Sequence, residues 1–342
     1  MNLFRTTRRP SPARLIPRVE ALEQRCVPAV MITQAGATLN ITGDPNHSHV
    51  IQVMDDGKGD FKVTADGMSP PTFTGITSLN ITGGTLNDVV IYQMTGPLKQ
   101  AENVTVRLRP GNDRFIGLLQ NDFENGGNLN LRVDGGPGND VISAIMLGNL
   151  QAGSGLTFTN FGGPGKDTEN LTMLGAVNLG SSLSVSMNPG LGGARETVSL
   201  LGSKSIGGTV SIDLEGGIGN DQELVNVTDN IETTGFVTGT ERGKPGTDTE
   251  TVNYLGQDQG ILQVRADGGP DNDTITVDIT LTPGSNGVVL AAVNGGPGND
   301  HLTLQVLKQL ATDTPTVSAT LDGGPGTDTA SVTPNVTVSN VP

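Results

Sequence analysis

The sequence predicts an all-β protein folded as a β-solenoid, and three observations lead to this prediction. Short segments rich in glycine and aspartate recur along the 342 residues. Between them, apolar and polar residues alternate with the period of a half-buried strand. The composition also favours strands, because Trp is absent, Tyr occurs 2 times and Phe 8 times, which leaves Val, Ile, Leu, Ala and Thr to build the core.

The repeat is clearest in the unit Gly-Gly-Pro-Gly-Asn-Asp, which occurs at residues 135–140 and again at 295–300. The closing acid of each unit marks the phase of the repeat. Successive closing acids are about 27 residues apart, a spacing within the range of known repeat architectures. The predicted series is Asp60, Asp88, Asp113, Asp140, Asp167, Glu196, Asp221, Asp248, Asp273, Asp300 and Asp328.

Each unit between two closing acids predicts two strands joined by a turn. After Asp273, the apolar residues Ile275, Val277, Ile279 and Leu281 alternate with polar ones. Residues 283–287 form a turn of Pro, Gly, Ser and Asn, and 288–293 form a second apolar strand. The unit from 140 to 167 has the same order, with strands expected at 141–147 and 156–161.

A unit this short cannot bury a core alone, so it must stack on its neighbours. A propeller blade needs about 40 residues or more, and an antiparallel barrel or sandwich does not require such even spacing. We therefore expect a parallel β-helix or β-roll-like solenoid of about eleven coils over residues 31–342. Stacking at about 4.8 Å per strand would give a rod of roughly 50 Å. Residues 31–59 are expected to form an initial coil or a cap.

Residues 1–30 differ from the rest of the chain, since they carry six arginines and two glutamates, a net charge of +4. Val19-Glu-Ala-Leu-Glu-Gln-Arg25, followed by Pro28-Ala29, resembles the N-terminal motif of predicted exported proteins of planctomycete bacteria. The resemblance implies export to the cell surface or beyond. The alternative is a disordered basic tail. No apolar run approaches the length of a membrane span.

Gly-Gly-x-Gly-x-Asp resembles the start of the calcium-binding nonapeptide of the repeats-in-toxin (hemolysin-type) family, whose eighth position is a large apolar residue. Residues 135–143 and 295–303 match every position, with Ile142 and Leu302 as the apolar residue, whereas Glu169 and Glu223 take that place in 162–170 and 216–224. The resemblance implies calcium between equivalent corners, bound by aspartate and by glycine carbonyl oxygens. The implied ligands are Asp140, Asp167, Asp221, Asp248, Asp273, Asp300 and Asp328, with Gly135, Gly295 and Gly323 among the glycines.

One difference from that family limits the calcium prediction. The family's nonapeptides run in tandem, whereas this chain has one per coil of about 27 residues, so a calcium row would follow a single edge. The alternative is that the corners are tight turns alone, because Gly, Pro, Asn and Asp favour turns on steric grounds. Against this alternative, stacked acids repel each other without a counterion.

The net charge and the positions of Arg and His residues limit the classes of partner and activity that the sequence supports. From residue 31 onward the net charge is −19, against −15 for the whole chain, which argues against nucleic acid and anionic membranes as partners. A polysaccharide lyase needs calcium-binding carboxylates beside a base. The candidate bases Arg107, Arg109, Arg114 and Arg132 stand at different phases of the repeat. His47 and His49 would share one face of a strand, but no third metal ligand is evident.

The sequence thus predicts a non-enzymatic, exported or cell-surface structural or adhesive repeat protein that binds calcium. Extracellular polysaccharide or surface proteins are the other partners considered. The alternatives are a polysaccharide-binding module and a carbohydrate-active β-helix enzyme. A flat exposed strand face rich in Thr and Asn would favour the structural and binding functions, and a groove of clustered Asp and Arg would favour the enzyme.

Overall fold

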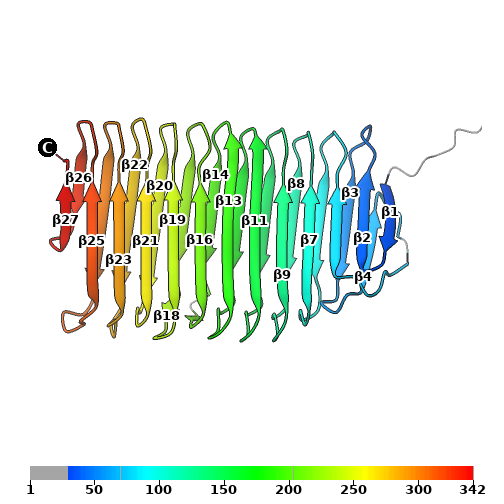
Figure 1. The fold of residues 1–342 in the computed structure, drawn as a ribbon, viewed down its shortest axis with the longest axis horizontal. Helices are drawn as coiled ribbons and strands as arrows, with labels where there is room; N and C mark the ends of the chain where they lie inside the picture. The colour runs from blue at the N-terminus through cyan, green and yellow to red at the C-terminus, as the bar shows by residue number, and fades with distance from the viewer. Residues whose placement is uncertain (1–29, 70, 203, 342) are drawn as a thin grey trace, which may run out of the picture.

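The computed structural model describes residues 30–69, 71–202 and 204–341, and it is a β-solenoid built from strands alone over these ranges. Two long sheets, here named sheet A and sheet B, face each other along the rod with their strands running across it (Figure 1). The predicted fold class is confirmed. The export motif predicted from residues 19–29 lies outside the described residues.

Sheet A has 13 strands, and all neighbours except the first pair are parallel. In spatial order they are β1 (Val30–Ala35), β2 (Thr38–Gly43), β5 (Ser78–Thr82), β7 (Ala101–Arg107), β9 (Asn128–Asp134), β11 (Gly155–Pro164), β13 (Ser182–Leu191), β16 (Thr209–Glu215), β19 (Phe236–Arg242), β21 (Ile261–Asp267), β23 (Val288–Asn294), β25 (Thr316–Asp322) and β27 (Val336–Ser339).

Sheet B has 12 strands, and a separate pair of two short strands lies at the opposite edge from the glycine corners. In chain order the strands of sheet B are β3 (Val50–Asp55), β4 (Phe61–Ala65), β6 (Val89–Met94), β8 (Arg114–Leu119), β10 (Val141–Met146), β12 (Thr168–Met173), β14 (Arg195–Leu200), β17 (Gln222–Val227), β20 (Thr249–Gly256), β22 (Thr274–Leu281), β24 (His301–Lys308) and β26 (Thr329–Val332). The short pair is β15 (Ser205–Ile206) and β18 (Asn230–Ile231).

One coil consists of a strand in sheet B, a turn, a strand in sheet A and a glycine corner. Strand β10 is followed by β11, and the corner at Gly162–Asp167 then leads into β12. Val141 pairs with Thr168 of the next coil, and Leu156 pairs with Leu183, in each case one repeat later in the sequence. Because each residue lies beside its equivalent in the next coil, the period of the sequence becomes the register of both sheets.

The N-terminal end departs from this pattern. Strand β1 is antiparallel to β2, and β4 is antiparallel to β3, so residues 30–65 contribute two hairpin pairings that cover the first coil. The solenoid has about nine turns rather than the predicted eleven. The reason is that Asp60 lies in the β3–β4 hairpin, and the regular steps begin only at Asp88.

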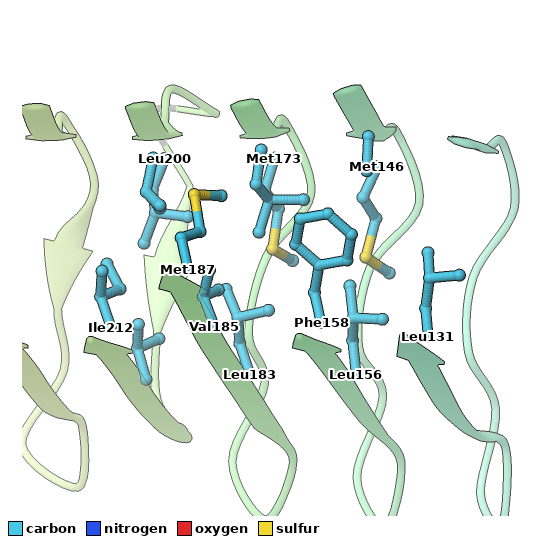
Figure 2. Packing of buried hydrophobic residues seen from close by; sticks show 14 of the residues in the cluster. Leu131, Met146, Leu156, Phe158, Met173, Leu183, Val185, Met187, Leu200 and Ile212 are labelled. Carbon is cyan, nitrogen blue, oxygen red and sulfur yellow. The ribbon is translucent and has the colours of Figure 1, made fainter. Parts of the chain in front are cut away.

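The core is a set of stacked rows of apolar side chains between the two sheets. In sheet A, Leu131, Phe158, Val185 and Ile212 occupy equivalent positions of successive strands, and each is at most 1% exposed. From sheet B, methionine and leucine side chains of β10, β12 and β14 point toward this row (Figure 2). Each coil therefore buries its apolar side chains against those of the facing sheet and against the equivalent side chains of the neighbouring coils.

The tightest contacts between coils lie at the corners, and they predict which glycines cannot be replaced. A Cβ on Gly138, whose φ is +151°, would lie 1.5 Å from the carbonyl oxygen of Gly111 in the preceding coil. We expect Gly138→Ala to lower the free energy of unfolding by at least about 4 kcal/mol, because backbone must move against backbone. Gly239, inside β19, is the matched control, since its added Cβ would meet nothing within 4 Å.

We expect Gly239→Ala to be neutral or slightly stabilising, by up to about 1 kcal/mol. Thermal and denaturant unfolding of the two variants, followed by circular dichroism, measures both effects. Equal stability of the Gly138→Ala variant and the wild type would contradict the close approach of the coils.

Candidate functional site

The glycine corner joins each strand of sheet A to the next strand of sheet B along one edge of the rod. At residues 135–140, Gly136 has a φ of +90°, a conformation that favours glycine. A Cβ on Gly135 would lie 2.5 Å from Oδ2 of Asp140, so the first glycine packs directly over the closing carboxylate. Gly295 and Gly323 cover Asp300 and Asp328 in the same way.

The closing aspartates form a buried ladder along this edge. The backbone N–H of Asp113 donates to Oδ1 of Asp140 at 2.7 Å, and that of Asp140 donates to Oδ1 of Asp167 at 2.8 Å. Each carboxylate thus accepts the amide of the equivalent residue in the preceding coil. The ladder consists of Asp88, Asp113, Asp140, Asp167, Asp221, Asp248, Asp273, Asp300 and Asp328.

Two members of the predicted series are wrong. The ladder residue between Asp167 and Asp221 is Ala194, whose N–H donates to Oδ1 of Asp221 at 2.6 Å, and not Glu196. At the N-terminal end His49 takes the position assigned to Asp60, because the His49 amide donates to Oδ1 of Asp88. An acid two residues after the corner kept the apparent spacing regular, so spacing alone could not distinguish Glu196 from a corner residue.

The second oxygen of the ladder carboxylates is the atom along this edge that could take up a proton or bind a cation. Among the described residues, Oδ2 of every ladder aspartate from Asp113 onward has no hydrogen-bond partner. Burial raises the pKa of Asp140, Asp248 and Asp273 to about 7, and that of Asp113 and Asp167 to about 6. A row of carboxyl groups stacked at about 4.8 Å needs protons or a cation to offset its repulsion.

A second acidic column lies deeper, and the sequence interpretation missed it. Glu169, Glu196, Glu223 and Glu250 pair in register on successive strands of sheet B, and all four point into the core. The flanking coils have Ile142 and Ile275 at this position.

Neither carboxylate oxygen of Glu169, Glu196 or Glu223 has a partner in the described structure. Burial raises the pKa of Glu169 and of Glu250 to about 8, and it holds the pKa values of Glu196 and Glu223 well above the ordinary range.

The facing sheet adds one more acid to this column. Glu241, in β19 of sheet A, is completely buried, and the charges of Glu223 and Glu250 add to the desolvation that raises its pKa. The signal was present in the sequence, because the four glutamates of sheet B follow one another at the repeat period, in the position that the calcium-binding nonapeptide fills with an apolar side chain. Glu169 and Glu223 depart from the apolar residue of the nonapeptide, but this departure alone does not show that the four glutamates point into the core.

The structure places the implied calcium ligands in one row along the corner edge. Asp140, Asp167, Asp221, Asp248, Asp273, Asp300 and Asp328 all belong to the ladder. Over the described part of the chain, no three His, Cys, Asp or Glu side chains form a group that could hold a metal ion. Corner sites of the implied kind would also use glycine carbonyl oxygens, so calcium binding stays a prediction.

The two histidines do not form the considered metal pair. His49 is buried, its Nδ1 lies 2.8 Å from Asp66 Oδ2, and its Nε2 lies 3.0 Å from the carbonyl oxygen of Asp44. His47 is exposed and contacts the carboxylate of Asp44. Both lie before β3 begins at Val50, so strand alternation does not apply to them.

Comparison with known proteins gives no family, since no protein-family model, no curated protein and no solved structure matches the chain. The described residues include no helix that is long and apolar enough to cross a membrane.

The buried acids predict that stability falls as the pH rises. The folded protein keeps protons on these carboxyl groups at a pH where the unfolded chain, with ordinary pKa values of 3.8 and 4.5, has lost them. Their stabilising contribution is therefore complete below about pH 4 and is lost as the pH rises to about 8, where Glu169 and Glu250 ionise. We expect the melting temperature, without added metal, to fall continuously from pH 5 to pH 9.

The variant Glu169→Gln, Glu196→Gln, Glu223→Gln and Glu250→Gln tests whether these buried glutamates cause the pH dependence of the melting temperature. Glutamine has nearly the same shape and no charge, so this variant should melt higher than the wild type at pH 9 and show a flatter pH profile. Asp60→Asn together with Glu232→Gln is the control, because both side chains are exposed, and it should keep the wild-type profile. Equal slopes for all three proteins would contradict the assignment of the pH dependence to the column.

Proposed function

We propose that the protein is a non-enzymatic structural or adhesive rod, exported to the cell surface, with calcium bound along its aspartate ladder. The observation that carries the proposal is the outer face of sheet A. Outward positions of successive strands are in register, so side chains of one kind form rows along the rod. One row is Asn103, Asn130, Thr157, Ser184 and Ser211, and all five side chains are exposed.

This face offers short hydroxyl and carboxamide groups at a regular spacing of about 4.8 Å. At Gly155 a side chain is missing from the neighbouring row, and a shallow cavity of about 160 Å³ lies there, lined by Asn128, Asn130 and Ser182 among others. Such a face favours contact with a regular extended partner, such as a polysaccharide or a surface protein, over chemistry on a small substrate.

The positions of the arginines support a non-enzymatic function. Arg107 and Arg132 lie on the outer face of sheet A, whereas Arg114 lies on the outer face of sheet B and Arg109 lies at a corner. The guanidinium of Arg132 lies 4.3 Å from the centre of the Phe161 ring, which gives it a structural partner. The candidate bases of a lyase therefore belong to different surfaces.

The calcium part of the proposal has its support in the unpaired ladder oxygens. Calcium prefers carboxylate and carbonyl oxygens, and the corners present both in a repeated arrangement. At pH 8 we expect millimolar calcium, added after a chelator, to raise the melting temperature of the full chain. A ligand that binds only the folded state at 100 times its Kd adds about 2.7 kcal/mol of stability.

Asp140→Asn together with Asp248→Asn is the matched variant for this measurement. Asparagine keeps the oxygen that accepts the amide of the preceding coil but removes the charge. The variant should melt higher than the wild type in chelator and respond less to calcium, and magnesium should have a smaller effect than calcium. Identical melting of the wild type with chelator and with calcium would refute calcium binding at the ladder.

The adhesive part is tested by placing charge on one face. We expect Thr157→Glu, Ser184→Glu and Ser211→Glu together to reduce binding to isolated bacterial envelopes about tenfold, because carboxylates replace the hydroxyls of one row. The control is Thr249→Glu, Thr274→Glu and His301→Glu together, three exposed positions in one row of sheet B. Sedimentation of protein with envelopes measures binding, and circular dichroism confirms that both variants are folded. Unchanged binding of the sheet A variant would contradict the proposal.

A further inference from the structure

The corner between β13 and β14 is the place where the repeat is interrupted. Most corners end in a polar residue followed by aspartate, as in Asn139-Asp140 and Asn220-Asp221, but here the two residues are Gly193 and Ala194. Gly193 also differs in conformation, with a φ of +80°. Two polar side chains are therefore missing from one coil.

A cavity of about 480 Å³ occupies this corner. Lys166, Asp167, Gly193, Ala194, Arg195 and Asn220 are among the residues that line it. The cavity thus lies where the repeat elsewhere has its closing side chains, and residues of three successive coils border it.

The missing aspartate leaves a backbone donor without an acceptor. In the preceding coils, the N–H groups of Asp113 and Asp140 donate to the carboxylate of the next ladder residue. The corresponding N–H of Asp167 faces Ala194, and no acceptor for it exists among the residues with described positions. Asp167 is only 2% exposed, and a buried N–H without an acceptor is rare in proteins. The N–H groups of Gly193 and Asn220 likewise donate to no atom of the described chain.

Two basic side chains border the cavity and are available to an anion. Lys166 and Arg195 are exposed, and neither takes part in the ion pairs found in the described ranges. Two carboxylates border the same corner: Oδ1 of Asp167 accepts the Asp140 amide and Oδ1 of Asp221 accepts the Ala194 amide, whereas Oδ2 of each has no partner in the described chain. The positive charge of Lys166 and Arg195 must therefore offset these two carboxylates as well as attract the ligand. Glu196 points away from this surface, into the core.

We propose that this cavity binds a carboxylate group of an acidic sugar chain, such as a uronic acid residue. The ligand carboxylate takes the place of the absent aspartate side chain and accepts the N–H of Asp167, while Lys166 and Arg195 supply the positive charge. The same carboxylate chemistry occurs in small free acids, which the experiment separates from a sugar chain. The site does not depend on calcium at the ladder or on the outer face of sheet A.

The experiment is isothermal titration of the full chain with galacturonate oligomers, monomeric galacturonate and neutral galactose oligomers. We expect binding of the acidic oligomer and none of the neutral one. Ala194→Asp supplies the missing carboxylate from the chain itself, so it should weaken binding at least about tenfold, with circular dichroism confirming that the variant is folded. Lys166→Gln together with Arg195→Gln should also weaken binding at least about tenfold.

Arg114→Gln is the matched control, because Arg114 lies in the same outward row as Arg195 but follows an intact corner at Asp113. It should bind as the wild type does. Equally tight binding of the monomer supports the carboxylate site and assigns it to small acids instead of a chain. No binding of either acid to the wild type, or unchanged binding by both the Ala194→Asp and the Lys166→Gln/Arg195→Gln variants, overturns the proposal.

Discussion

The hydrogen bonding of each coil to the equivalent residues of the next is the interaction on which the rest of the structure depends. At the corners, Gly138 donates to the carbonyl of Pro164 at 2.9 Å, and Gly165 donates to that of Leu191 at 2.7 Å. At the opposite edge, Leu147 donates to the carbonyl of Leu119 at 2.9 Å. Since adjacent coils are hydrogen-bonded along both edges and through both sheets, the backbone of each coil lies close to the equivalent backbone of the next coil. The corner glycines follow directly from this, because a Cβ on Gly165 would lie 1.5 Å from the Gly138 carbonyl oxygen.

The same constraint decides the electrostatics. Residues one period apart are neighbours, so any acid that is repeated must stack on another acid. On the outside of the corner the repeated residue is most often asparagine, and Asn139 accepts the backbone amide of Lys166 and donates its own backbone amide to Asn112, both at 2.8 Å. Directly inside, the repeated residue from Asp88 onward is aspartate in every coil except that of Ala194, and from Asp113 onward each of these aspartates keeps a buried carboxylate oxygen without a partner in the described chain. Burial and like charge then act together, which explains why most of the carboxyl groups with raised pKa values lie in the aspartate ladder and the glutamate column.

The period and the strands could be predicted from sequence because they depend on local pattern. Ile275, Val277, Ile279 and Leu281 alternate with polar residues, and all four are fully buried in β22. The phase at Glu196 could not be predicted, since a corner acid and an acid two residues later differ in side-chain direction but hardly in spacing. Asp60 was misassigned for another reason: its distance from Asp88 fits the repeat period, although it lies between the paired strands β3 and β4. The hairpins of residues 30–65 were also missed in detail, because antiparallel pairing at a solenoid end leaves no periodic signal. Side-chain direction at the corner, which decides whether an acid is a ligand or a hydrogen-bond acceptor, requires the coordinates.

The interruption at Gly193 and Ala194 shows how much variation the coil register tolerates. The backbone bonds on both sides persist, since Gly192 donates to the carbonyl of Ile218 at 2.8 Å and Arg195 donates to that of Asp167 at 2.9 Å. On the other flank, Gln222 donates to the carbonyl of Ala194 at 2.9 Å. The loss is therefore confined to the acceptor side chains, and the strands before and after the corner stay in register. A solenoid can thus open a cavity in one coil without losing the register of its strands, because the backbone makes the bonds that align the coils and the cavity forms where side chains are missing.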